Sequence, residues 1–257
     1  MNMTKESTEV TYDLDLLAGS QMAWDRSEGL RFVYKGIYRG IRARCTDGAT
    51  LEIGSGIGVG KAFFENLVTS DIVKTPYVDR AISAYEIEPD AGGAWANIFA
   101  IDVLHHLTQP MRFFKSAAAV LKLGGRIILV EPAATFGGRL FYSLFHHEPI
   151  QPQLIVPSFK FDANGAGGEF ANMGMGVGLF RDHRSIVAAR LAEFGLTVKS
   201  VRYRDFLVYP LTGGYSKPQL LATSVLRVFT RIEALIPQCF FRVLGLRMVI
   251  VLEKNGG

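Results

Sequence analysis

Short apolar runs alternate with segments of helical periodicity along most of the chain. Continuous apolar runs such as Ile127-Ile128-Leu129-Val130 are typical of strands covered on both faces, so they indicate a parallel sheet between layers of helices. The expected strands are residues 50–53, 67–70, 98–103, 126–130, 197 to about 209, and 247–253. The expected helices are residues 33–44, 60–66, 111–121, 185–194 and 218–244. The pattern therefore predicts an α/β fold.

Two segments interrupt this alternation. Residues 132–184 are rich in glycine and contain Pro149, Pro152 and Pro157, and a loop-rich stretch of this length inside a compact domain is usually a functional lid or partly disordered. Residues 210–246 form an apolar, helical insertion. We therefore expect a single domain over residues 1–257, with a ligand-binding core at 48–132. The insertions at 133–184 and 210–246 are expected to form a loop-rich and helical cap.

Composition narrows the class of protein. The 257 residues are 49% apolar and 20% charged, which excludes disorder, collagen and a coiled-coil rod. Cys45 and Cys239 are the two cysteines and lie too far apart in sequence to suggest a disulfide framework or a cysteine-based zinc site. No secretory signal and no apolar run of about 18 residues is recognisable, so a cytoplasmic protein is expected.

Positive charge gathers in the last third of the chain. Residues 181–257 contain 12 Lys and Arg against 5 Asp and Glu, whereas residues 1–180 contain 16 against 19. Such an excess suits nucleic acid, an anionic membrane surface or an acidic substrate. It is equally well explained by arginines scattered over a solvated face.

The most informative segment follows the first expected strand. It reads Glu52-Ile53-Gly54-Ser55-Gly56-Ile57-Gly58-Val59-Gly60, and glycines between a strand and a helix let backbone N–H groups approach a ligand. The spacing does not fit G-x-G-x-x-G, since Val59 or Lys61 would occupy the last position. Nor is it a P-loop, because Ala62 follows Lys61.

The segment resembles the first motif of class I S-adenosylmethionine-dependent methyltransferases, E-x-G-x-G-x-G. Three further landmarks resemble the same family in order and spacing. Asp71 lies 19 residues after Glu52, residues 98–107 resemble the fourth-strand motif, and residues 121–132 resemble the Gly-Gly turn and fifth strand. The resemblance covers residues 48–132 and points to the small-molecule methyltransferases. It implies a Rossmann-like, seven-stranded, mostly parallel sheet with helices on both faces.

The resemblance also implies S-adenosyl-L-methionine as cofactor and S-adenosyl-L-homocysteine as product. Asp71 would bind the ribose hydroxyls, since one carboxylate can accept from both. Many relatives carry an acid after the third strand for adenine, whereas this chain has Ser83, Ala84 and Tyr85. The full set of expected cofactor-binding residues is Glu52, Gly54, Ser55, Gly56, Gly58, Asp71, Ile72, Ser83, Ala84, Tyr85, Asp102 and Val103.

Methyl transfer from a sulfonium is a direct displacement, so a base is needed only for an acceptor that arrives protonated. The candidates for such a base are His105, His106, Glu131, His146 and His147. We expect no metal site among the histidines, because neighbours in sequence point in different directions on a strand or helix. A mononuclear site would need one histidine from each pair and an acid such as Glu148.

The acceptor is expected to be a small or lipid-like, partly apolar metabolite. Aromatic residues crowd the first insertion, namely Phe136, Phe141, Tyr142, Phe145, Phe159, Phe161, Phe170 and Phe180; they would line a cap or simply pack it against the domain. No DNA substrate is expected, because Asp102-Val103-Leu104-His105 lacks the two prolines and aromatic of base-holding motifs. An RNA methyltransferase and a cofactor-binding module without methyl transfer remain alternatives. Peripheral membrane contact and a homo-oligomer are left open as partners.

Overall fold

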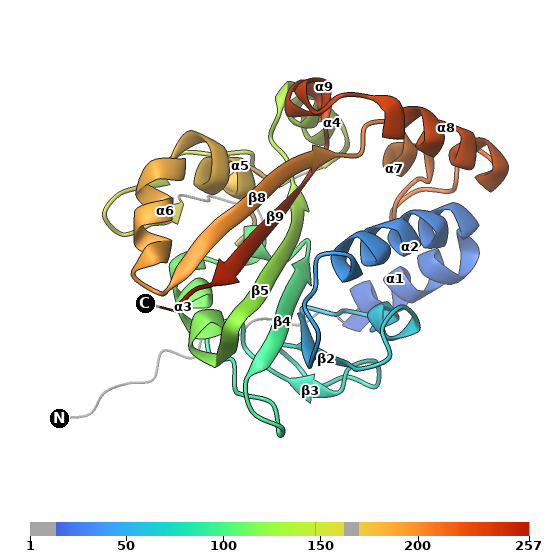
Figure 1. The fold of residues 1–257 in the computed structure, drawn as a ribbon. Helices are drawn as coiled ribbons and strands as arrows, with labels where there is room; N and C mark the ends of the chain where they lie inside the picture. The colour runs from blue at the N-terminus through green and yellow to red at the C-terminus, as the bar shows by residue number, and fades with distance from the viewer. Residues whose placement is uncertain (1–13, 147, 162–169, 257) are drawn as a thin grey trace.

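A seven-stranded sheet forms the centre of the computed structural model, which describes residues 14–146, 148–161 and 170–256 (Figure 1). The strand order is β3-β2-β1-β4-β5-β9-β8. The strands of this sheet are β1 Thr50–Ile53, β2 Leu67–Asp71, β3 Arg80–Ala81, β4 Trp95–Ile101, β5 Leu121–Pro132, β8 Leu196–Arg204 and β9 Arg247–Lys254. The seven-stranded, Rossmann-like sheet predicted from the sequence is confirmed.

The first five strands of the sheet are parallel, and β9 is the exception. Ile53 pairs with Ser70 on β2 and with Ala100 on β4, both in parallel register. By contrast, β9 runs antiparallel to β5 and to β8. Because the carboxyl ends of β1, β4 and β5 meet at one edge of the sheet, the side chains that follow these strands are brought together there.

Two apolar layers cover the faces of the sheet. On one face, Ile98, Ile127 and Ile250 pack with residues of α3 and α6; on the other, Phe99, Ile128 and Val249 pack with residues of α2 and α8. The helices are α1 Leu14–Arg26, α2 Glu28–Arg42, α3 Pro110–Val120, α4 Phe136–Phe145, α5 Met175–Val177, α6 Arg184–Ala192, α7 Val208–Leu211, α8 Thr223–Leu235 and α9 Gln238–Leu244. Figure 1 shows α2 and α8 on one side of the sheet and α3 and α6 on the other.

Helix α2 shows how the sequence specifies this packing. Ser27 caps its start by accepting a hydrogen bond from Leu30 N at 3.1 Å, which satisfies one of the free N–H groups of the first turn. The buried face then recurs at helical spacing through Tyr34, Tyr38 and Ile41. The helix begins earlier than the predicted residues 33–44, because the residues before Val33 complete its first turn.

The predicted helix at residues 60–66 is wrong. Only a 3-10 turn, η1 Val59–Ala62, follows the glycine loop. Phe63 stacks on Tyr38 with ring centroids 4.8 Å apart, and Phe64 stacks on Phe99 at 5.4 Å. The helical turn ends at Phe63, whose φ of −120° departs from the helical value.

The first insertion is more regular than its glycine content suggested. It contains α4, α5, a π-helical turn η3 Gly178–Asp182 and a short hairpin of β6 Leu154–Ile155 and β7 Lys160–Phe161. A Cβ at Gly137 would lie 2.8 Å from the backbone of Leu244 in α9. Glycine therefore allows α4 and α9 to approach closely here, rather than marking a loop.

The end of β8 also differs from the prediction. The strand stops at Arg204 instead of about residue 209, because Asp205 adopts a positive φ of 57° and turns the chain. Glu233 of α8 then accepts from the backbone N–H groups of Leu207 at 2.6 Å and Val208 at 3.0 Å. Within the described part of the chain, no helix has the length and apolar character needed to cross a membrane.

Candidate active site

The glycine loop after β1 has the backbone shape of a ligand cradle. Gly54, Gly56 and Gly58 have φ of 68°, 53° and 67°, which side chains with a Cβ rarely adopt. A Cβ at Gly54 would collide with Val103, and one at Gly58 would collide with the carbonyl oxygen of Tyr77. At Gly56 a Cβ would meet no protein atom within 4 Å. The loop thus packs tightly against the protein at Gly54 and Gly58 and faces open space at Gly56.

Asp71, at the end of β2, fixes this loop. Its Oδ2 accepts a hydrogen bond from Gly56 N at 2.9 Å, and its Oδ1 accepts from Ile72 N at 2.8 Å. The Ser55 hydroxyl accepts from Ser70 N at 3.1 Å, which ties the loop to the same strand. Asp71 therefore lies at the glycine loop, and its role in binding ribose stays a prediction.

A cavity of about 240 Å³ opens beside the loop. Gly54, Gly56, Glu52 and Asp102 line one side of it. Four tyrosines from α2 and from the segment after β8, namely Tyr34, Tyr38, Tyr209 and Tyr215, line the other. Tyr34 and Tyr38 lie four residues apart on one face of α2, a spacing that is visible in the sequence but is equally typical of any amphipathic helix.

Glu52 is one of two acids in this cavity with an unused oxygen. Only 2% of the residue is exposed, and the Tyr38 hydroxyl donates to its Oε1 at 2.7 Å. Its Oε2 is buried and has no hydrogen-bond partner among the residues described. Burial raises the pKa of Glu52 to about 7, because removing water disfavours the charged carboxylate.

Asp102 is the second of these acids. It follows β4 with a φ of 55°, a strained conformation for a residue other than glycine. Arg247 Nη2 on β9 donates to its Oδ2 at 2.8 Å, whereas its Oδ1 is buried with no partner in the described structure. Burial raises the pKa of Asp102, although Arg247 opposes that effect. Asp102 therefore presents a second carboxylate oxygen that awaits a partner.

Arg247 is a site residue that the sequence analysis missed. It is 4% exposed, and its guanidinium lies over the Tyr209 ring at 4.2 Å. In the sequence it contributes only to the basic excess of the last third, since an arginine at the start of a strand carries no signal of burial. The structure shows that Arg247 forms an ion pair with Asp102.

The stretch expected to bind adenine lies just beyond β3. The Ser83 hydroxyl accepts from Tyr85 N at 3.2 Å, and the Tyr85 hydroxyl lies 3.1 Å from Thr108 Oγ1. Ala84 is buried, while Ile72 is 44% exposed. Among the described residues, these four do not line the cavity of the glycine loop. Their role in adenine binding stays a prediction.

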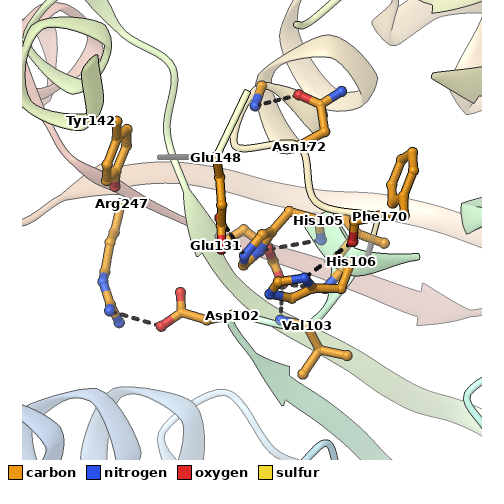
Figure 2. Close-up of polar contacts among 12 residues, drawn as sticks. Asp102, Val103, His105, His106, Glu131, Tyr142, Glu148, Phe170, Asn172 and Arg247 are labelled. Atoms are coloured by element: carbon orange, nitrogen blue, oxygen red, sulfur yellow. Dashed lines mark hydrogen bonds and ion pairs between the residues drawn. The ribbon is translucent and has the colours of Figure 1, made fainter. Parts of the chain in front are cut away.

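A separate group of polar side chains follows β4 on the 3-10 turn η2 Leu104–His106 (Figure 2). Glu131 on β5 accepts backbone hydrogen bonds from Val103 at 3.0 Å and Leu104 at 2.8 Å. It also lies 2.8 Å from His105 Nδ1. Burial lowers the pKa of His105, but the hydrogen bond and the charge of Glu131 outweigh burial and raise it overall. His105 and Glu131, two of the candidate bases, are therefore in direct contact.

His106 and Glu148 complete this group. The rings of His105 and His106 lie with centroids 4.1 Å apart, so the expectation that these neighbours point in different directions is wrong. The tight 3-10 turn brings both rings to the same side. Glu148 Oε2 lies 3.7 Å from His105 Nε2. His146 is exposed at the end of α4, and His147 lies outside the described residues.

The aromatic residues of the first insertion have divided roles. Phe161 and Phe180 are buried in the core, and Phe159 and Phe170 pack against it. Phe136 and Phe145 are 71% and 65% exposed. As far as the structure describes the chain, these aromatic residues do not line the cavity at the glycine loop. Packing explains the buried phenylalanines, and the exposed ones form part of an outer surface.

These features fit the cofactor that the sequence pattern suggests. S-adenosylmethionine carries a sulfonium and an ammonium group, and a cavity lined by the acids Glu52 and Asp102 favours a ligand with positive charge. The open side of Gly56 leaves room for close approach to the backbone. The residues present therefore suit a ligand of this charge and shape.

Comparison with known structures identifies the fold. A SAM-dependent methyltransferase from Archaeoglobus fulgidus is similar over 94% of this chain and 100% of its own, with a TM-score of 0.50 and 14% identity. A complex of the Haloferax volcanii Trm112 methyltransferase activator with a methyltransferase contains a chain that is similar over 95% and 96%, with a TM-score of 0.50 and 11% identity.

A further similar structure contains ligands. It is the Burkholderia thailandensis 1,6-didemethyltoxoflavin-N1-methyltransferase with its substrate and S-adenosylhomocysteine, with a TM-score of 0.45 and 14% identity over 94% of this chain and 86% of that one. No protein-family profile and no curated protein sequence matches this chain. The protein thus has the S-adenosylmethionine-dependent methyltransferase fold that its sequence motifs predict.

Proposed function

We propose that the protein transfers a methyl group from S-adenosylmethionine to a small or lipid-like, partly apolar acceptor. One observation carries the proposal: the glycine loop opens at Gly56 onto a cavity that is also lined by Glu52 and Asp102, two acids that each keep one oxygen without a partner among the described residues. Leaving such groups unsatisfied is costly unless a ligand pairs with them. Two carboxylates in one cavity favour a ligand that is positively charged.

Each end of the cofactor has a set of residues to receive it. We assign Asp71 and the N–H groups of the glycine loop to the ribose end, with residues 83–85 beside the adenine. Glu52 and Asp102 would receive the ammonium group. Arg247 holds Asp102 at 2.8 Å and so fixes the free oxygen in place. The four tyrosines exclude water from this end of the site.

The reaction requires the protein mainly to align the acceptor with the methyl group. S-adenosylmethionine, when bound, supplies a methyl group that its sulfonium has already activated. The chain must orient an acceptor lone pair in a dry pocket. We place the attacking atom near η2, because Val103 contacts the glycine loop and His105 and His106 follow it directly. These histidines and Glu148 would contact the acceptor.

Two exposed helix faces support an acceptor with an apolar body. On α4, Phe136, Leu140 and Leu144 recur every four residues and are 71%, 56% and 66% exposed. On α8, the exposed apolar residues are Val225, Val228, Ile232 and Leu235. Figure 1 shows α4, α9 and α8 at the same end of the molecule. Surface helices seldom present apolar side chains in rows.

We infer that this surface rests on an anionic lipid bilayer. Arg139 on α4, Arg227 and Arg231 on α8 and Arg242 on α9 accompany the apolar residues, which is the composition of interfacial helices. A lipid-like acceptor could then reach the site from the bilayer. Cytoplasmic localisation and a homo-oligomer remain predictions.

The proposed reaction is tested with methyl-labelled S-adenosylmethionine and fractions of a cell extract. We expect label in small molecules soluble in organic solvent, and none with a Gly56→Val variant. Parallel assays with total RNA and DNA at two ionic strengths test the alternative. Label only in nucleic acid, with the steep salt dependence of phosphate contacts, would overturn the proposal, as would binding of the cofactor without any labelled product.

Membrane contact is tested by sedimentation with vesicles of neutral lipid or of neutral lipid plus phosphatidylglycerol. We expect binding to the anionic vesicles that a Phe136→Ser/Leu140→Ser variant loses. Leu123→Ser is the matched control, because Leu123 is 68% exposed but lies on β5, away from these helices. Equal binding by all three proteins would refute the surface, and apolar self-association would appear instead as a dimer in sedimentation velocity without vesicles.

A further inference from the structure

The group on η2 has the arrangement of a metal site, although the sequence pattern argued against one. His105, His106 and Glu148 each offer a ligand atom, and these atoms all lie within 4.8 Å of one another. We propose that His105, His106 and Glu148 bind one divalent transition-metal ion, such as Zn²⁺. The proposal extends the function above, because the ion would lie where we place the acceptor, but the binding itself does not depend on methyl transfer.

His105 is oriented as a metal ligand usually is. Its Nδ1 lies 2.8 Å from Glu131 Oε2, so Nδ1 is placed to donate its proton to the carboxylate, and Nε2 is the atom that would bind a metal once it has lost its proton. Glu131 is itself fixed by the N–H groups of Val103 and Leu104. A carboxylate behind a histidine sets the tautomer and the ring orientation, and it strengthens the metal bond.

His106 repeats this arrangement with a different acceptor. Its Nδ1 lies 3.3 Å from the carbonyl oxygen of Phe170, and a backbone carbonyl is the other common partner of a metal-binding histidine. Both rings therefore commit Nδ1 to the protein and leave Nε2 for a ligand. Figure 2 shows the two rings side by side below Glu148.

Glu148 supplies the third ligand. Its Oε2 is buried and has no hydrogen-bond partner within the described ranges. The 3.7 Å between this oxygen and His105 Nε2 is too long for a hydrogen bond. The segment around Glu148 is held in place, because Met173 N donates to Pro149 O at 2.9 Å and Asn172 Nδ2 donates to Gln151 O at 2.7 Å.

The distances suit a transition-metal ion. Zinc binds imidazole nitrogen and carboxylate oxygen at about 2.0 to 2.2 Å, so two ligand atoms of a tetrahedral ion lie about 3.4 Å apart. The separation of 3.7 Å between Glu148 Oε2 and His105 Nε2 is close to this value. All the ligand atoms lie within 4.8 Å of one another, so the widest pair would have to close by at most about 1.4 Å. Two imidazoles and one carboxylate favour zinc, iron, cobalt or nickel over magnesium or calcium.

Three protein ligands leave a coordination position for another molecule, as in catalytic rather than structural sites. An oxygen or nitrogen of the acceptor could take that position. The ion would lower the pKa of an acceptor hydroxyl, so that the hydroxyl would lose its proton to water. Its oxygen could then attack the methyl carbon as the sulfur–methyl bond breaks. The specific acceptor class is therefore a molecule with a metal-binding oxygen or nitrogen next to its apolar body.

The test uses the full chain, stripped of metal by a chelator, and Co²⁺ as the probe. We expect visible d–d absorption that saturates at one ion per chain and disappears when Zn²⁺ competes. His106→Ala and Glu148→Gln should weaken Co²⁺ binding at least about 100-fold, and Glu131→Gln about 10- to 100-fold. The control is His183→Ala, a histidine outside the cluster, which should bind Co²⁺ as the parent does.

Calorimetry with S-adenosylhomocysteine in the presence of chelator separates this proposal from the proposed function. We expect the parent, His106→Ala and Glu148→Gln to bind it equally, which also shows that the variants are folded. Absence of Co²⁺ absorption in the parent, or equal Co²⁺ affinity in the parent and both variants, would overturn the metal site. If the parent did not bind S-adenosylhomocysteine, that result would instead contradict the proposed function.

Discussion

Three acids lie at the carboxyl ends of β1, β4 and β5, at one edge of the sheet, and they differ in how many hydrogen-bond partners they have. Glu131, at the end of β5, accepts from two backbone N–H groups at 2.8 and 3.0 Å and contacts His105 at 2.8 Å. Glu52 on β1 and Asp102 after β4 each keep a buried oxygen with no partner in the described chain. The protein supplies hydrogen-bond partners for both oxygens of Glu131, whereas it leaves one oxygen of Glu52 and one of Asp102 without a partner among the described residues.

This difference distinguishes an acid that supports the structure from acids that are available to a ligand. A carboxylate with all its partners fixes the residues around it, and here Glu131 fixes η2. A buried carboxylate with a free oxygen destabilises the folded protein. A ligand that supplies a cation or a hydrogen-bond donor removes this cost. We therefore expect substitutions at the two places to change different properties of the protein.

Arg247→Met should give the largest loss of stability, about 4 kcal/mol, because it leaves Asp102 without the charge that compensates it. Urea unfolding measures this change. Arg126→Met is the control, since Arg126 and Glu253 form a more exposed pair at 3.2 Å, for which we expect about 1 kcal/mol or less. Equal losses would show that the Arg247 pair is no more important than a surface ion pair.

Glu52 should make stability depend on pH. Its pKa is raised from an ordinary value of 4.5 to about 7, so the folded state holds the proton more tightly than the unfolded state. The free energy of unfolding should therefore fall as pH rises from about 4.5 through 7, by about 3 kcal/mol at most. Glu52→Gln should lack this component, which urea unfolding at pH 5 and pH 8 would show. Parallel curves for the two proteins would contradict the raised pKa.

Gly56→Val should weaken S-adenosylmethionine binding at least about 100-fold, which is about 2.7 kcal/mol. The new side chain enters the open space beside the loop and blocks approach to the backbone. Gly124→Val is the matched control, because Gly124 also has a positive φ, 73°, and a Cβ there would meet no atom within 4 Å, yet it lies in the turn before the buried part of β5. Calorimetry that finds both variants equally weakened would trace the effect to backbone strain.

The affinity for S-adenosylmethionine should rise with pH, in the direction opposite to the stability. A bound cation favours ionised Glu52, so the affinity should increase about tenfold between pH 6 and pH 8. Binding should release a proton near pH 7, measurable as a dependence of the calorimetric heat on the buffer. Glu52→Gln should show neither effect. A flat pH profile in the parent would mean that the ligand does not contact this acid.

Local sequence determined much of the fold. Apolar runs with β-branched residues specified β1, β5 and β9, since a strand buried on both faces needs no partner to be recognised. The prediction failed where packing overrides local preference. The chain leaves the helical conformation at Phe63, where a longer helix was expected. Gly137 lies inside α4, where the approach of α9 leaves no room for a side chain.

The candidate site divides in the same way. The order of Glu52, the glycines and Asp71 along the chain was enough to predict a glycine loop with Asp71 beside it, because these residues lie within consecutive elements. Arg247, the tyrosines of the cavity and the contact of His105 and His106 with Glu148 come from segments far apart in sequence. Only the tertiary structure decides such contacts, because the sheet order places β9 beside β5 and the turn η2 directs two neighbouring rings to one side. No local pattern encodes a burial or a distance of that kind.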